Sequence, residues 1–113
     1  QNNRLEKVEV EFSSTPAPEL PIDYLLSQNY PNPFNPTTNI KFAVPKVGHV
    51  KIAIYNMLGQ EIRTLVAEQM ERGTRVVEWN GRDNNGAQVT SGMYIYRMTS
   101  GSFVQSHKML LLK

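Results

Sequence analysis

The residues that could bind a metal ion gather in one short run. Asp83-Asn84-Asn85-Gly86 places side-chain oxygens at alternate positions, as calcium-binding loops do. The glycine follows Asp83 too early for the register of such a loop, and the composition instead favours a tight turn. We therefore predict a turn in preference to a metal site; a cation bound here would contact Asp83 and Asn85.

The other reactive residue types do not form a recognisable catalytic set. His49 and His107 lie in separate segments and cysteine is absent, so we expect two surface histidines and neither a zinc site nor thiol chemistry. Ser91 precedes Gly92, but Val89 stands where a nucleophile elbow needs glycine. The sequence also lacks the glycine and lysine pattern of a phosphate-binding loop. We predict that the chain is not an enzyme and needs no cofactor.

The aromatic residues leave two interpretations open. Tyr94 and Tyr96 share one strand face with Met98, and Trp79 ends an earlier strand. An exposed, coplanar row of these rings could stack on sugars. A small β-sandwich also needs large buried side chains, so we favour core packing, with the tyrosine hydroxyls bonded at the edge of the core.

The composition is that of one globular domain with a modest core. The 113 residues are 40% hydrophobic and 19% charged, and the net charge of +2 comes from charges of alternating sign. Nucleic-acid binding needs clustered Lys and Arg, so we do not expect it. The longest apolar cluster, residues 109–112, is far below the roughly 20 residues of a transmembrane helix.

Short segments of alternating hydrophobicity predict the elements that would position these residues. The segments alternate apolar and polar side chains and end at Gly, Pro or Asn: residues 40–44, 50–54, 76–79, 93–98 and 103–112. Residues 61–66 also favour a strand, although periodicity alone allows a short helix over residues 60–71. Asn80-Gly81 is a strong turn signal. The sequence thus predicts an all-β fold, an immunoglobulin-like β-sandwich of about seven antiparallel strands.

The first residues differ in character from the rest. Val8, Val10 and Phe12 alternate with charged residues as in a half-buried strand, and residues 13–21 are rich in Pro and small polar residues, which predicts an extended linker. We place a domain boundary after residue 21, giving a strand and linker of the parent protein over 1–21 and a domain over 22–113. The sequence leaves open whether the first strand belongs to the preceding domain or returns to pair with this one. The linker is a natural site for proteolysis.

A second proline-rich stretch lies inside the predicted domain. Pro31, Pro33 and Pro36 alternate with asparagines, which excludes a helix or an interior strand. Asparagine side chains bond nearby backbone, so we expect an ordered loop, with Tyr30 and Phe34 anchoring it to the core.

Four ordered blocks carry a family resemblance. Residues 26–38, 54–61, 91–98 and 108–113 resemble, in order and spacing, the type A C-terminal sorting domains of the type IX secretion system. Residues 79–86 are also similar to the immunoglobulin-like domain of flagellar hook-capping proteins. Asn80 departs from both families, which more often have aspartate there.

The resemblance implies a non-catalytic module that directs a covalently linked upstream cargo through the periplasm and across the outer membrane of a Gram-negative bacterium. Its implied partners are the outer-membrane type IX translocon and a sorting peptidase that can cleave the domain and attach the cargo at the cell surface. The implied recognition loop consists of Asn29, Tyr30, Pro31, Asn32, Pro33, Phe34, Asn35 and Pro36. The implied terminal signal consists of Lys108, Met109, Leu110, Leu111, Leu112 and Lys113. The family's turn motifs fall on Gly59, Gly92 and Tyr94.

Two other functions fit a small β-sandwich. A carbohydrate-binding accessory module of a secreted glycoside-degrading enzyme would need the exposed aromatic row described above. An assembly domain like that of the hook-capping protein would use an open sheet edge.

Overall fold

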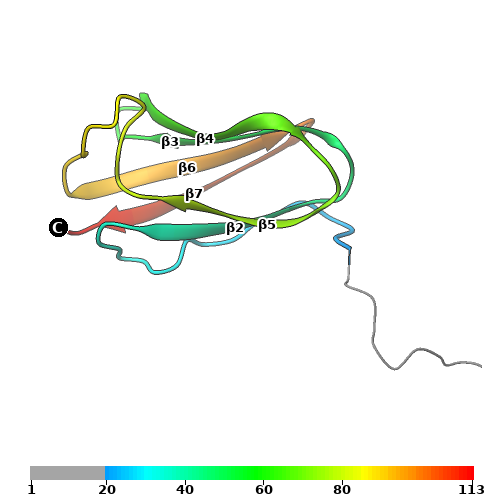
Figure 1. Ribbon diagram of the computed structural model, residues 1–113, viewed down its shortest axis with the longest axis horizontal. Coiled ribbons are helices and arrows are strands. Elements are labelled where there is room, and N and C mark those ends of the chain that lie inside the picture. The colour runs from blue at the N-terminus through cyan, green and yellow to red at the C-terminus, as the bar shows by residue number, and fades with distance from the viewer. Residues whose placement is uncertain (1–19) are drawn as a thin grey trace, which may run out of the picture.

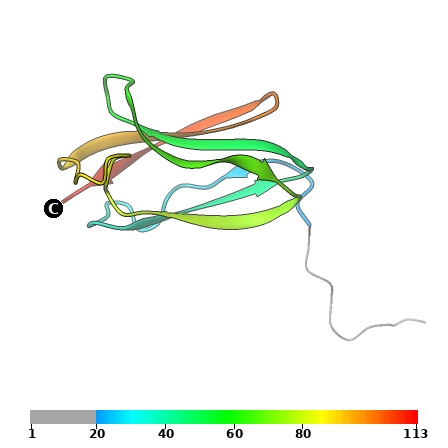
Figure 2. The same cartoon turned by 45° about the horizontal axis from the view of Figure 1, so that its top comes forward.

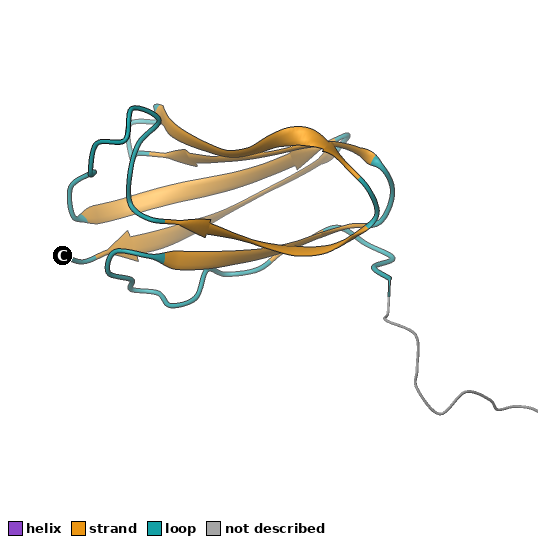
Figure 3. Ribbon diagram, in the orientation of Figure 1, coloured by secondary structure: helices purple, strands orange, loops and turns teal. Residues whose placement is uncertain are grey.

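The structure, a computed structural model, describes residues 20–113 as two antiparallel β-sheets packed face to face (Figure 1, Figure 3). The described residues contain seven strands and no helix: β1 (Leu25–Leu26), β2 (Thr38–Val44), β3 (Gly48–Tyr55), β4 (Glu61–Met70), β5 (Gly73–Trp79), β6 (Gly92–Ser100) and β7 (Phe103–Leu111). Residues 20–113 therefore contain no helix that could cross a membrane.

The strands form a three-stranded sheet in the order β1-β2-β5 and a four-stranded sheet in the order β4-β3-β6-β7. Figure 2 shows the two layers edge-on, with the β3–β4 and β6–β7 hairpins at opposite ends of the sandwich. Glu71 and Arg72 carry the chain from β4 in one sheet to β5 in the other. This arrangement confirms the predicted immunoglobulin-like sandwich.

The core lies between the sheets because alternate residues of each strand point inward. In β6 the even-numbered residues from Tyr94 to Ser100 are buried, whereas Arg97 is exposed. The largest fully buried side chains come from both sheets and from one loop: Trp79, Tyr96, Phe34, Phe42, Leu26, Ile40, Ile52, Ile54, Met98, Met109, Leu111 and Val44.

Two elements differ from expectation in detail. Residues 61–70 form strand β4, so the helical alternative for residues 60–71 is wrong; β-bulges opposite Ile52 and Ile54 break its alternation and explain the weak period. Strand β5 begins at Gly73, three residues before the predicted segment. The predicted strand around Val8, Val10 and Phe12 lies outside the described residues.

Candidate functional site

The Asn-Pro loop (residues 29–36) is bonded to the open edge of β7. The amide of Phe34 donates to the carbonyl of Leu110 at 3.0 Å, and the amide of Leu112 donates to the carbonyl of Phe34 at 3.0 Å. The side-chain oxygen of Asn32 accepts a third hydrogen bond, 3.0 Å from the amide of Leu110. The loop and the terminal block, 77 residues apart at the Phe34–Leu111 bridge, therefore form one structural unit.

Buried polar side chains fix the shape of this loop. Asn29 is only 2% exposed, and its amide nitrogen donates to Thr38 Oγ1 at 2.9 Å and to the carbonyl of Pro31 at 3.1 Å. Thr38 Oγ1 in turn donates to the same Pro31 carbonyl at 2.8 Å. Since proline also restricts the backbone, the loop is rigid, as the sequence predicts.

The two aromatic residues of the loop have different roles. Phe34 is 2% exposed and packs against Trp79, with ring centroids 5.6 Å apart. Tyr30 is 79% exposed; only its backbone is held, by two hydrogen bonds with Asn39. The predicted anchor is confirmed for Phe34 and wrong for Tyr30, because the extended backbone around Tyr30 turns its side chain to solvent.

The other large aromatic residues belong to the core. Trp79 is fully buried, its indole nitrogen donates to the carbonyl of Arg82 at 2.9 Å, and Tyr94 packs edge-on against it at 5.5 Å. The hydroxyls of Tyr94 and Tyr96 donate to the carbonyls of Thr90 and Ser27 at 2.6 and 2.5 Å. The core interpretation is confirmed, and these rings form no exposed row for stacking on a sugar.

Burial also raises the pKa of one of these tyrosine hydroxyls. Tyr96 is fully shielded from solvent, and this desolvation raises the pKa of its hydroxyl to about 12. The hydroxyl therefore stays protonated at physiological pH and serves as a donor that ties β6 to the segment leading into the Asn-Pro loop.

The turn between β3 and β4 contains Gly59, one of the predicted family positions. The Asn56 side-chain oxygen accepts from the amides of Leu58 and Gln60, both at 3.0 Å. Gly59 has φ 84°, a conformation that side chains other than glycine's rarely adopt. This ordered turn leaves Met57 and Leu58 56% and 85% exposed.

Asp83 closes a turn, as predicted. Its carboxylate accepts from the amides of Asn85 and Ala87 at 2.9 and 3.0 Å. The Asn84 side chain reaches away to accept from the amide of Thr64 at 3.0 Å. Within residues 20–113, no three His, Cys, Asp or Glu side chains are grouped to hold a metal ion.

One histidine prediction is wrong. His49 is exposed, but His107 is half-buried, and its Nε2 lies 2.7 Å from the carbonyl of Leu26 and 3.1 Å from the side-chain nitrogen of Gln105. His107 also packs against the ring of Tyr96, with centroids 5.6 Å apart. It faces inward because the odd-numbered residues of β7 point to the core. The sequence could have shown this, since residue 107 is in phase with Met109 and Leu111.

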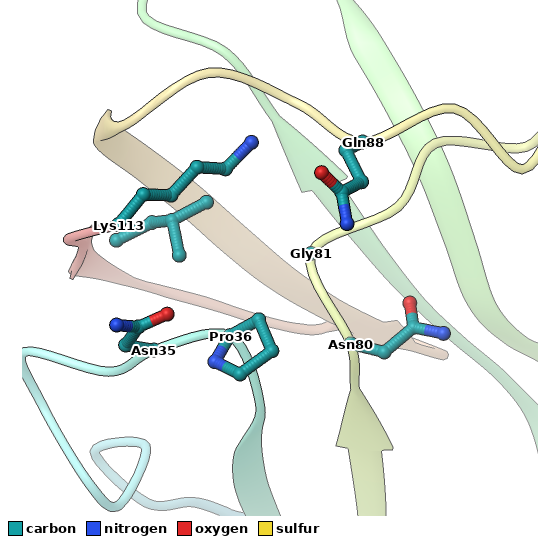
Figure 4. Close-up of a pocket in the computed structure, with 7 residues that line it drawn as sticks. Asn35, Pro36, Asn80, Gly81, Gln88 and Lys113 are labelled. Carbon is teal, nitrogen blue, oxygen red and sulfur yellow. The ribbon is translucent and has the colours of Figure 1, made fainter.

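A small hollow lies where the Asn-Pro loop, the loop after β5 and the chain's last residues meet (Figure 4). Its volume is about 250 Å³. It is lined by Pro36, Gly81 and Leu111, and by three side-chain amides and one ammonium group: Asn35, Asn80, Gln88 and Lys113. Asn80, where aspartate is more common in the resembling families, therefore contributes to a lining without negative side-chain charge.

The predicted site residues meet at one end of the sandwich. Gly92 is paired with Leu111, and Tyr94 with Met109, so the third and fourth blocks are neighbours in one sheet. The Asn-Pro loop covers the edge of the fourth block, and the turn at Gly59 follows β3 at the same end (Figure 1). The first described residues are at the other end of the sandwich, where Arg72 Nε, just before the start of β5, donates to the carbonyl of Pro21 at 2.9 Å.

The comparisons with known proteins agree with this fold. Residues 30–102 match the family model described as the FlgD Ig-like domain. No curated protein sequence matches the chain.

Among solved structures, PorU of Porphyromonas gingivalis, crystallised as a dimeric latent form, is similar with a TM-score of 0.63 and 17% identity over 80% of this chain. PorZ of Porphyromonas gingivalis, an essential bacterial surface component of the type IX secretion system, is similar with a TM-score of 0.51 and 22% identity over 76% of this chain. The chain spans only 9% and 11% of those two proteins, so the likeness concerns a small part of each. The matched stretch runs from Tyr30 in the Asn-Pro loop to the β6–β7 turn, and the chain belongs to the FlgD Ig-like domain family.

Proposed function

We propose that this chain is a non-catalytic sorting domain that directs an upstream cargo across the outer membrane through a type IX secretion system. The observation that carries the proposal is spatial: the four blocks that resemble sorting domains meet at one end of the sandwich, although they span residues 26 to 113. The likeness to PorZ, a surface component of such a system, supports the same proposal.

The geometry suits the recognition of a folded signal. The Asn-Pro loop and the end of β7 are joined by backbone hydrogen bonds, so a receptor would bind a surface that is already ordered. Little conformational entropy of this domain would then be lost on binding. The cargo would be joined upstream of Pro21, which is bonded to Arg72 at the end of the sandwich away from this surface. Cargo size would therefore not hinder contact between the receptor and the site.

The domain's recognition residues are proposed to be the Asn-Pro loop and residues 108–113. Cleavage by a sorting peptidase would fall in the linker before residue 22. The resulting location of the cargo is the cell surface or the medium, by way of the periplasm of a Gram-negative bacterium.

A secretion assay tests the proposal. A fluorescent protein with a periplasmic export signal is fused to residues 1–113 and expressed in a host with a working type IX system. We expect fluorescence at the cell surface or in the medium, and its loss in a host lacking the translocon.

The matched variant removes only Lys113, which is exposed and lies beyond both backbone hydrogen bonds to Phe34, so the core and the attachment of the Asn-Pro loop are retained. Reduced export of this folded variant would assign part of the signal to the terminus. Retention of the intact fusion in the periplasm, in a folded state shown by protease resistance, would refute the sorting function.

A further inference from the structure

An apolar patch lies on the outer face of the four-stranded sheet, at the end where the four blocks meet. Its members come from the β3–β4 turn, the start of β6 and the end of β7: Met57, Leu58, Met93, Ile95, Leu110 and Leu112. We call this set the Met-Leu patch. Four of the members are 39–85% exposed, and Ile95 and Leu110 are half-buried.

The strand register brings these residues together. Met93 is directly opposite Leu110 in the β6–β7 pair. Both face outward, because their neighbours Tyr94 and Met109 are buried in the core. On the other side of β6, Ile95 is opposite Tyr55, the last residue of β3. Met57 and Leu58 follow in the turn, which projects at this end of the sheet in Figure 2.

Hydrogen bonds within the turn hold Met57 and Leu58 in exposed positions. The Asn56 side chain bonds the amides of Leu58 and Gln60, and its own amide nitrogen donates to Gln60 Oε1 at 2.7 Å. An ordered turn cannot fold its apolar tip back onto the core without breaking these bonds. Exposed apolar side chains held in this way are typical of a contact surface for another molecule.

The charges around the patch identify the kind of partner. Lys108 is opposite Ile95, Lys113 follows Leu112, and Arg97 is two residues beyond Ile95 on the same face. All three are exposed.

The nearest carboxylate in register is Glu61, opposite Tyr55, and it is already bonded to the Lys51 ammonium at 2.9 Å. The patch thus has an apolar centre and a cationic rim. Its complement is a protein surface with an apolar centre and acidic residues around it.

We infer that the Met-Leu patch is the docking surface of this domain for such a protein, an acidic-rimmed apolar surface on the secretion apparatus. The inference rests on the proposed sorting function and assigns it a specific contact. Methionine side chains are flexible and polarisable, so Met57 and Met93 can adapt their shape to a partner surface.

The experiment compares variants of the full-length fusion in the secretion assay. Met57→Ser with Leu58→Ser removes the exposed tip, and Lys108→Glu with Lys113→Glu reverses the rim. Val104→Ser is the matched control, because Val104 is also on the outer face of β7 and is 59% exposed, but pairs with Thr99 near the β6–β7 turn, at the other end of the sheet. Equal thermal melting curves of the purified variants establish that all are folded.

We expect export to fall roughly tenfold or more in the tip variant, since contact residues at the centre of an interface commonly change affinity by that factor. The rim variant should fall several-fold, and Val104→Ser should stay within about twofold of the unchanged chain. Normal export of both patch variants, with the unchanged fusion also exported, would overturn the docking inference and leave the sorting function intact. Failure of the unchanged fusion would refute the sorting function itself.

Two further outcomes would overturn the inference in favour of another occupant. One is sedimentation of the purified chain with phosphatidylcholine–phosphatidylglycerol vesicles that the tip variant loses, which would identify a membrane surface. The other is dimerisation in analytical ultracentrifugation that the tip variant loses, which would identify a second copy of the chain.

Discussion

Replacing the two aromatic residues of the Asn-Pro loop separately tests whether the loop is held by burial of one ring. Phe34→Ala removes a side chain that is 2% exposed and packs 5.6 Å from the ring of Trp79. Truncation of a buried Phe to Ala costs about 3–5 kcal/mol, from lost transfer free energy and from the cavity left behind. Tyr30→Ala removes a side chain that is 79% exposed and leaves its backbone bonds in place, so we expect a change within about 0.5 kcal/mol.

A loss of this size is large for a domain of 94 described residues, whose stability should be about 5–14 kcal/mol. In thermal terms, a loss of about 4 kcal/mol corresponds to a Tm lower by about 15–30 °C. Trp79 is the single tryptophan of the chain and lies beside Phe34, so its fluorescence reports the unfolding transition directly. Because Phe34→Ala also alters the surroundings of Trp79, far-UV circular dichroism should be recorded on the same urea series as an independent probe.

The reasoning is refuted if Phe34→Ala costs less than about 1 kcal/mol, a value typical of a partly exposed site. It is equally refuted if Tyr30→Ala costs as much as Phe34→Ala, since the two side chains would then contribute alike to holding the loop.

Three further measurements test other contacts. In urea unfolding, Gly81→Ala should destabilise the domain by about 1 kcal/mol more than Gly86→Ala. Both glycines have positive φ, 76° and 83°. A Cβ at Gly81 would lie 3.2 Å from a backbone oxygen of the Asn-Pro loop, whereas a Cβ at Gly86 would have nothing within 4 Å. Asn32→Ala should lower the free energy of unfolding by about 1 kcal/mol and speed hydrogen exchange at the amide of Leu110, to which the Asn32 side chain is bonded. The side chain of Asn35 has no hydrogen bond among the described residues, so Asn35→Ala should change neither quantity. The pKa of Tyr96 is about 12 in the folded protein against about 10 in the unfolded chain, so its protonated hydroxyl contributes stability below pH 10 that is lost between about pH 10 and 12. The free energy of unfolding of the unchanged domain should therefore fall by about 2–3 kcal/mol over this range, and that of Tyr96→Phe should not show this fall.

The strands with one buried face were predictable, because burial of one face imposes a period of two on the sequence. In β2, Ile40, Phe42 and Val44 are all buried, and the alternation was plain. In β4 the alternation fails at the bulges, so periodicity could not distinguish a strand from a helix. Strand β1, Leu25–Leu26, has only two residues and carries no period at all.

The candidate site was less predictable, because long-range pairing leaves no local pattern. The sequence indicated an ordered Asn-Pro loop and a terminal strand, but not that Phe34 and Leu111 pair. Tyr30 and Phe34 are both aromatic and in the same loop, so their residue types gave no reason to separate them. Both backbones are bridged to a strand, Phe34 to Leu111 of β7 and Tyr30 to Asn39 of β2, but only the ring of Phe34 points inward, where it packs against Trp79.

Each of the four blocks contains buried residues that support the fold, and this limits how a sorting signal can be located by mutation. Met109 and Leu111 of the terminal block are fully buried, as is Phe34 of the first. Substitutions there would stop export by unfolding the domain, whatever the receptor reads. A receptor that binds the folded domain contacts the exposed residues of the blocks, such as Leu58 and Lys108, and loss of export in a folded variant of those residues is the result that separates recognition from stability.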